Sequence, residues 1–372
     1  MPPLRLRQHS FSAPYERDER WVSKCPLIVY SRGLESDIQV IDGRVRDVFL
    51  DERLRECVSF LYVDDLTDDG QIVKTPIGTG FFILKSLAKE DEVETATSID
   101  NSHDCFASYL ITAAHVVKKC VEENWNPLYV RINKKDGTYW DQPTDPVSWT
   151  RHDEDDVALI ELGDIPNLTK ETVSLRALGF PNLATDEYMA SIPVTAGYEV
   201  FFLGLFAGHP GKGHAQPIIR FGNIALMRHD KIDSYLSNDP DAEAVELDAY
   251  LVEARSWGGQ SGSPALFYYP PLQPSSSPLW VRFQTPIVLG LVHGQYERDA
   301  QQIANKALAS AGIAMVIPAS KIRQIIMRQD LQDQRAKDLK KAKGVRPEGA
   351  PVPKPAVLSA PDFAGQEKGN ES

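Results

Sequence analysis

The sequence predicts an all-β protein built from short antiparallel strands. Its runs rich in Val, Ile, Phe and Tyr are short, and Gly, Pro, Asn or Asp lie at their ends, a pattern typical of strands joined by tight turns. With 372 residues, of which 42% are hydrophobic, the chain can bury a large core. None of its apolar runs reaches the roughly 18 residues of a membrane-spanning helix, so we expect no membrane partner.

Three segments carry the groups that nucleophilic catalysis needs. An apolar run at 109–117 ends in small residues and His115, and the run at 155–162 opens with an acidic pair followed by aliphatic residues. The third segment, 257–264, places Ser261 between glycines. A serine hydroxyl reacts only when a base takes its proton and N–H donors stabilise the developing oxyanion. The chain therefore supplies a base, a carboxylate and a nucleophile in the order His, Asp, Ser.

The residues within these segments suggest individual roles. A glycine two positions before the serine lets the backbone turn tightly, so that the amides of Gly259 and Ser261 can point at one spot. Asp153, Asp155 and Asp156 all compete as the carboxylate that orients the histidine. Asp156 is the one that directly precedes the Val-Ala-Leu run.

The motifs Thr-Ala-Ala-His at 112–115, Asp-Val-Ala-Leu at 156–159 and Gly-Gln-Ser-Gly-Ser-Pro at 259–264 resemble, in order, the three motifs of the trypsin/chymotrypsin-like serine peptidases. Further runs resemble strands of that family, at 78–83, 198–204, 219–224 and 288–294. The end, at 312–318 and followed by a helix, resembles the bacterial, glutamyl-endopeptidase-like or trypsin-2-like members.

This resemblance implies a fold of two six-stranded antiparallel β-barrels and a division of the chain into five parts. These are an N-terminal extension (1–54), a first barrel with His115 and Asp156 (55–185), a second barrel with Ser261 (186–317), a C-terminal α-helix (318–343) and a disordered tail (344–372). An acidic surface insertion is expected at 90–98. In the helix, apolar residues recur at i, i+3 and i+4, so we expect one face to pack on the second barrel. We expect its far end to be solvated.

The resemblance also implies a mechanism. It makes His115 the general base and then acid, Asp156 the orienting carboxylate, Ser261 the nucleophile, and the amides of Gly259 and Ser261 the oxyanion hole. The chain would then be a serine endopeptidase that works through an acyl-enzyme on protein or peptide substrates. We expect no cofactor and no metal.

One departure from the family concerns activation. Many secreted members have aspartate before the nucleophile, where it pairs with a new N-terminus, but this chain has Gln260. A glutamine cannot form that ion pair, so we expect no activation by N-terminal cleavage.

A second departure concerns the substrate pocket. Arg255, His293 and Gly294 fall where the primary pocket of the family lies, and positive groups there would favour a substrate Glu or Asp. His293 is, however, one residue later than the histidine of glutamyl endopeptidases, and such a shift turns a strand side chain to the other face. It would then contact the triad aspartate instead.

Charge and cysteine content limit partners and compartment. A net charge of −12 argues against a nonspecific nucleic-acid binder. The four cysteines lie at 25, 57, 105 and 120, none near Ser261, and no apolar signal segment opens the chain. We therefore expect a cytoplasmic location and buried free thiols, with a Cys105–Cys120 pair as the alternative. The alternatives are a peptidase that a regulatory partner activates and a non-catalytic binding or scaffolding module on the same fold.

Overall fold

The computed structural model describes most of the chain between residues 52 and 344. The described residues are 52–67, 69–87, 106–162, 172–211, 214–234, 245–254, 259–269, 286–295 and 312–344. The predicted tail beyond 344, the acidic insertion at 90–98 and all but the last residues of the N-terminal extension lie outside these ranges.

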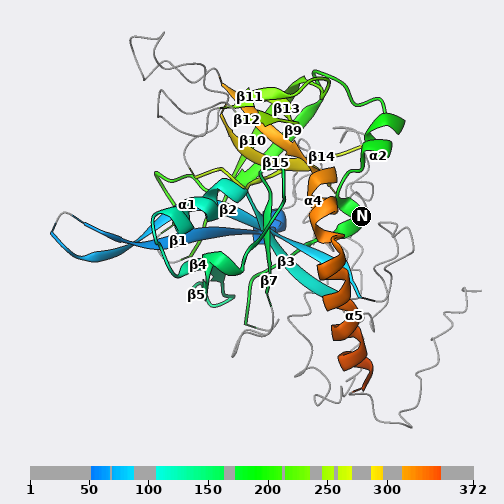
Figure 1. Cartoon of the computed structure of the whole chain (residues 1–372). Coiled ribbons are helices and arrows are strands. Elements are labelled where there is room, and N and C mark those ends of the chain that lie inside the picture. Colours follow the sequence, from blue (N-terminus) through cyan, green and yellow to red (C-terminus); the bar gives the residue numbers. More distant parts are fainter. Residues whose placement is uncertain are drawn as a thin grey trace, which may run out of the picture.

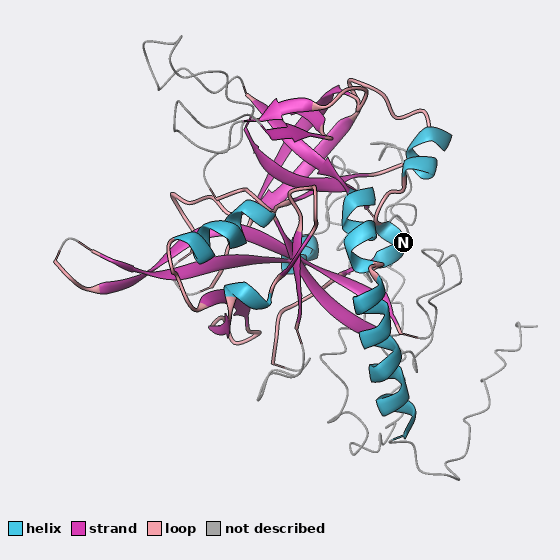
Figure 2. Ribbon diagram, viewed as in Figure 1, coloured by secondary structure: helices cyan, strands magenta, loops and turns pink. Residues whose placement is uncertain are grey.

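Two β units follow each other along the chain. Figure 1 shows the sheet of the first unit below the barrel of the second, with helices α4 and α5 running down beside them. Strands make up most of both units, as Figure 2 shows. The prediction of a mostly β fold is therefore confirmed.

The first unit is an eight-stranded sheet in which seven strands follow the order β5-β4-β1-β2-β3-β7-β6. Its strands are β1 (Val58–Leu66), β2 (Ile72–Ser86), β3 (Phe106–Thr112), β4 (Leu128–Asn133), β5 (Tyr139–Thr144), β6 (Thr150–Arg151), β7 (Ala158–Glu161) and β8 (Leu178–Gly179). All their pairs are antiparallel except that of β8, which pairs with β2 in parallel. Every residue of β3 is buried, as the apolar run before His115 led us to expect.

The prediction that this first unit is a closed six-stranded barrel is wrong for the described residues, because the sheet is open between β5 and β6. These two strands follow each other in the chain, but the 3-10 turn η3 (Pro146–Ser148) separates them. Proline has no N–H to donate to a strand partner. The Asp145 side chain also caps the turn by accepting a hydrogen bond from the Val147 N–H at 3.1 Å. The turn lies between β5 and β6, and these two strands do not pair with each other among the described residues.

The second unit is a closed six-stranded antiparallel barrel in the order β10-β13-β16-β15-β14-β9, as predicted. Its strands are β9 (Glu199–Gly204), β10 (Ile218–Leu226), β13 (Tyr250–Glu253), β14 (Pro264–Phe267), β15 (Ile287–Gln295) and β16 (Ile313–Pro318). A separate short pair, β11 (Ile232–Ser234) and β12 (Val245–Leu247), lies beside it. In β9, β14 and β16 nearly every residue is buried, so these strands line the core.

Helices connect and cover the two units. They are α1 (Ala114–Glu122), α2 (Asp186–Ser191), α4 (Ala319–Ile326) and α5 (Gln329–Gly344), with further 3-10 turns η2 (Glu52–Cys57) and η4 (Phe180–Asn182). The single C-terminal helix that the sequence predicts is two helices, because α4 ends at Ile326 and α5 begins at Gln329. Within the described residues, none of the helices has both the length and the apolar character needed to cross a bilayer.

The helix α4 packs as predicted, with Ile322, Ile325 and Ile326 buried. Although the sequence of α5 is mostly polar, its Arg335 is buried, with 0% of the residue exposed. Its guanidinium donates hydrogen bonds to the Tyr109 hydroxyl at 2.9 Å and to the Ile326 carbonyl at 2.8 Å. Since Tyr109 lies in β3, the helix that follows the second unit is anchored on the first.

Two cysteines of the described part of the chain, Cys57 and Cys120, are free and buried, as expected. Burial raises the pKa of the Cys57 thiol to about 12 and that of Cys120 to about 11. Because the thiolate is the reactive form, both side chains behave as inert core residues at neutral pH.

Candidate active site

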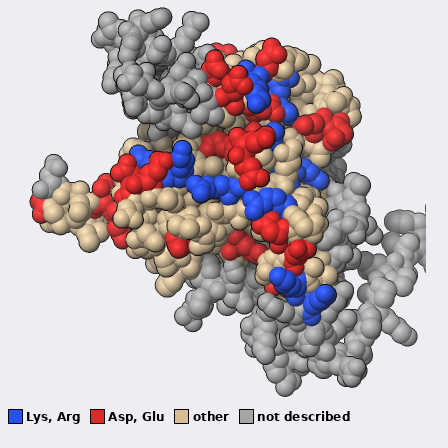
Figure 3. All heavy atoms as spheres, in the orientation of Figure 1, with Lys and Arg blue, Asp and Glu red and all other residues tan. Residues whose placement is uncertain are grey.

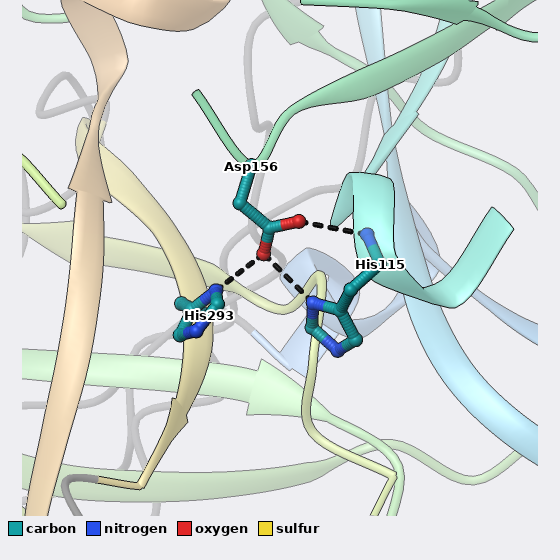
Figure 4. A group of neighbouring side chains, drawn as sticks. All are labelled: His115, Asp156 and His293. Carbon is teal, nitrogen blue, oxygen red and sulfur yellow. Dashed lines mark hydrogen bonds and ion pairs between the residues drawn. The ribbon is translucent and has the colours of Figure 1, made fainter. Parts of the chain in front are cut away.

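The predicted catalytic residues come from both units and meet at their junction. His115 is the second residue of α1, directly after β3, and Asp156 lies in the loop between β6 and β7. Ser261 lies in the turn that precedes β14, and His293 lies in β15. Figure 4 shows the side chains of His115 and His293 on either side of the Asp156 carboxylate.

The Asp156 carboxylate accepts three hydrogen bonds from the two histidines. Its Oδ1 accepts from the His115 backbone N–H at 2.7 Å, and its Oδ2 lies 2.7 Å from His115 Nδ1. The same Oδ2 lies 2.5 Å from Nδ1 of His293 (Figure 4). Of the three aspartates that the sequence left open, Asp156 is the one that contacts His115.

The protonation state of this group follows from its surroundings. Burial opposes charge on the Asp156 carboxyl, but the nearby histidines and their hydrogen bonds outweigh it, so the pKa of Asp156 is lowered. The carboxylate is thus ionised at neutral pH and can only accept hydrogen bonds. Both Nδ1 atoms must then carry hydrogen, which leaves Nε2 of a neutral His115 with the lone pair that a general base needs.

The loop that carries Asp156 is held by α4. Asp155 forms an ion pair with Lys321 of that helix, with the oxygen and nitrogen 3.0 Å apart. Nearby, the guanidinium of Arg228 forms ion pairs with the carboxylates of Asp186 and Asp248, with nitrogen–oxygen distances of 2.6 and 2.7 Å. On the face seen in Figure 3, basic side chains form a band across the middle of the molecule with acidic groups on both sides. Through the ion pair between Lys321 and Asp155, the helix α4 therefore holds the residue next to Asp156.

The backbone around Ser261 forms a tight turn that only glycine allows at its start. Gly259 has φ +93°, and a Cβ there would lie 2.6 Å from the Leu205 side chain. Thr79 of β2 ties the turn to the first unit, since its N–H donates to the Ser261 carbonyl at 2.9 Å and its Oγ1 to the Gly259 carbonyl at 2.8 Å. Among the described residues, no acceptor meets the N–H of Gly259 or Ser261. The assignment of these two amides to the oxyanion hole stays a prediction.

The Ser261 hydroxyl points at a backbone group in this structure. Its Oγ donates to the His293 carbonyl at 2.9 Å, and within the described part of the chain no hydrogen bond joins it to His115. His293 lies in a β-bulge, where Val292 is opposite Val316 and Gly294 is opposite Met315. Bulges redirect backbone and side-chain groups beside active sites. Proton transfer to His115 requires the hydroxyl to leave this carbonyl.

The side chain of His293 also forms a hydrogen bond with a serine. Nε2 of His293 lies 3.1 Å from Oγ of Ser234, the last residue of β11, and both residues are only 2% exposed. Ser234, His293 and Asp156 therefore have the connectivity of a Ser-His-Asp triad. The Asp156 carboxylate accepts a hydrogen bond from the ring of each of two histidines, His115 and His293. The sequence did not indicate Ser234, because no motif surrounds it and its role depends on a contact across the fold.

Comparison with known families decides the class of protein. The sequence matches the trypsin-like peptidase domain over residues 78–267, which is just over half of the chain. The chain belongs to the trypsin-like peptidase family. The match contains the segments of His115, Asp156 and Ser261. Among curated proteins, none matches this sequence.

Two solved structures are similar to parts of this trypsin-like peptidase at low sequence identity. The protease Rv3671c in an inactive form is 19% identical, and the alignment covers 73% of this chain and 88% of that one, with a TM-score of 0.36. Deg5 is 12% identical over the same shares of the two chains, with a TM-score of 0.40.

Two predicted pocket residues fall in different surroundings in this trypsin-like peptidase. Gly294 borders open space, since nothing lies within 4 Å of a Cβ placed on it. His293, in contrast, is buried with both ring nitrogens in hydrogen bonds, so its ring contacts the aspartate and does not face a substrate carboxylate. This is the alternative that the one-residue shift indicated. Arg255 lies outside the described residues.

Gln260, the residue before Ser261, is buried and 1% exposed. In the described part of the structure, neither its Oε1 nor its Nε2 has a hydrogen-bond partner. The expectation that N-terminal cleavage does not activate this trypsin-like peptidase stays a prediction.

The cluster of His115, Asp156 and His293 also has the composition of a metal site, since one ligand atom of each lies within 4.8 Å of the others. The facing atoms, however, are already paired as N–H donors and carboxylate acceptor. A metal ion would have to displace both Nδ1 hydrogens. The hydrogen-bonded arrangement therefore accounts for the cluster without an ion.

Proposed function

We propose that this protein is a serine endopeptidase in which Ser261 is the nucleophile, His115 the general base and Asp156 the group that orients His115. The observation that carries this proposal is the buried Asp156 carboxylate, which holds His115 by two hydrogen bonds of 2.7 Å. Together they fix the ring orientation and direct its basic nitrogen away from the carboxylate.

The reaction proceeds in two steps. His115 Nε2 takes the Ser261 hydroxyl proton as Oγ attacks the carbonyl carbon of a peptide bond, and the carbonyl oxygen becomes an oxyanion that the amides of Gly259 and Ser261 stabilise. The protonated histidine then gives its proton to the leaving amine, and the C–N bond breaks. In the second step water, deprotonated by the same histidine, hydrolyses the acyl-enzyme.

Exposure favours Ser261 over Ser234 as the nucleophile. Ser261 is half-buried and the His115 side chain is 25% exposed, so a substrate can reach both. Ser234 and His293 are each 2% exposed, and a peptide carbonyl cannot approach a hydroxyl buried to that extent. The glycine turn also surrounds Ser261, so in this proposal the amides of Gly259 and Ser261 donate to the oxyanion that forms beside this hydroxyl.

A partner-regulated peptidase is the second candidate, and one contact favours it. The Ser261 hydroxyl donates a hydrogen bond to the His293 carbonyl at 2.9 Å and not to His115, its proposed base. A substrate or regulatory protein that supplies a competing N–H to this carbonyl would free the hydroxyl for His115. Activity would then rise when such a partner binds.

Substitution of the two serines tests the proposal. We expect Ser261→Ala to abolish cleavage of a fluorogenic peptide library, with kcat at least about 10⁴-fold lower, because the nucleophile is lost. The matched variant Ser234→Ala should retain a tenth or more of the wild-type kcat. The reverse pattern, in which Ser234→Ala abolishes cleavage and Ser261→Ala does not, would assign the nucleophile to the buried serine.

A further inference from the structure

The environment of the Asp156 carboxylate contains a histidine that the proposed mechanism does not use. His293 Nδ1 lies 2.5 Å from the same Oδ2 that binds His115, and His293 Nε2 lies 3.1 Å from Ser234 Oγ. We propose that His293, held in place by Ser234, is a positioning residue that keeps Asp156 in the orientation His115 requires. This inference rests on the proposed function.

The hydrogens of this chain of contacts can be assigned. An ionised carboxylate only accepts, so the His293 Nδ1 must donate to Oδ2. In a neutral ring Nε2 is then an acceptor, and the Ser234 hydroxyl donates to it. Every polar atom of the His293 ring is thus satisfied although the residue is buried, which stabilises one tautomer and one ring orientation.

The position of Asp156 explains why a second contact is needed. It belongs to a loop, and its own neighbour Asp155 faces Lys321 of α4. The backbone N–H of His115 holds Oδ1, but the contact of His115 with Oδ2 comes from the ring that is itself to be oriented. His293 approaches from β15 of the second unit, so Oδ2 is held between two rings whose centroids are 5.2 Å apart and whose planes make an angle of 74°. The barrel of the second unit thereby holds the carboxylate that the first unit supplies.

Burial excludes other roles for the pair. Since His293 and Ser234 are each 2% exposed, their side chains contact neither substrate nor bulk water. Their effect on the reaction is exerted through Asp156, which makes His293 a positioning residue and not a catalytic one.

Three substitutions of His293 separate positioning from simple space filling. In His293→Asn the side-chain amide nitrogen occupies about the place of Nδ1 and can donate to Asp156. In His293→Gln the nitrogen extends to about the place of Nε2, toward Ser234, and in His293→Leu there is no donor. We expect kcat to fall by roughly 10- to 100-fold in the Leu variant, the effect of losing a hydrogen bond to a charged group. KM should change by less than about threefold, and the Asn variant should recover most of kcat while the Gln variant does not.

The Ser234→Ala variant tests the outer contact. We expect a smaller loss of kcat, roughly 3- to 10-fold, because the ring keeps its bond to Asp156 but loses the hydroxyl that holds it. Added to His293→Leu, the same substitution should cause no further loss, since the two residues act in one chain of contacts. Additive losses would overturn the proposal.

A measurement on the resting protein does not depend on activity. Far-downfield proton NMR should show two resonances from histidine–carboxylate hydrogen bonds in the wild type. One of them should disappear in His293→Leu, and His293→Asn should leave the His115 resonance in place. If the wild type shows a single resonance, or if the Asn, Gln and Leu variants lower kcat equally, His293 only fills space. If the two resonances are present but the wild type cleaves no peptide, the proposed function fails and the hydrogen-bonded positioning of Asp156 stands.

Discussion

Replacement of Asp156 with asparagine is expected to lower kcat by roughly 10⁴-fold, the usual effect of this substitution in a Ser-His-Asp triad. The carboxylate accepts all three hydrogen bonds that reach it, two from His115 and one from His293. An amide presents an NH₂ group to one set of these donors. At least one histidine must then change tautomer or move away, and a His115 that carries its hydrogen on Nε2 cannot act as a base. Steady-state kinetics on a fluorogenic peptide measures the effect.

The matched control for this variant is Asp153→Asn. Asp153 precedes the same run and was one of the three carboxylates that the sequence left open, but it is exposed. We expect its kcat to stay within about twofold of the wild type. If Asp153→Asn and Asp156→Asn lose activity to the same degree, the loss reflects the charge of the loop and not the orientation of His115.

Replacement of Arg335 with leucine is expected to cause the largest loss of stability, roughly 3 kcal/mol. The guanidinium is 0% exposed and donates hydrogen bonds to the Tyr109 hydroxyl and the Ile326 carbonyl. Leucine removes both of these buried hydrogen bonds, and with them the link between α5 and β3. Urea unfolding followed by circular dichroism measures the change in the free energy of unfolding.

The control changes the same helix at an exposed position, in Lys337→Leu, which should alter the free energy of unfolding by less than about 0.5 kcal/mol. Arg335→Lys should fall between the two, since an ammonium keeps the charge but loses the planar, forked donor geometry. An Arg335→Leu protein that unfolds at the wild-type urea concentration would show that α5 contributes no stability through this residue.

The parts of the site that the sequence predicted are those with a local signal. His115 lies shortly after the fully buried strand β3, Asp156 lies shortly before the strand β7, and Gly259 stands where a positive φ is required. Each feature is visible in a few neighbouring residues, because the strand ends and the turn are determined by short-range patterns.

The parts that the sequence did not predict depend on contacts between distant segments. Ser234 and Arg335 lie in segments without a motif, and their partners His293 and Tyr109 are far away in the chain. The bulge in β15 decides which way the His293 side chain points, and strand periodicity alone does not show it. The open edge of the first sheet likewise depends on which strands pair with each other, which a count of strands does not reveal.

Covalent labelling with a fluorophosphonate probe, followed by mass spectrometric mapping of the modified peptide, tests the central claim most directly. The probe forms a stable adduct only with a serine that a neighbouring base activates. We expect a single adduct on Ser261, and we expect His115→Ala to prevent its formation. An adduct on Ser234, or no adduct on the folded wild-type protein under conditions in which it cleaves peptides, would contradict the assignment of Ser261 as the nucleophile.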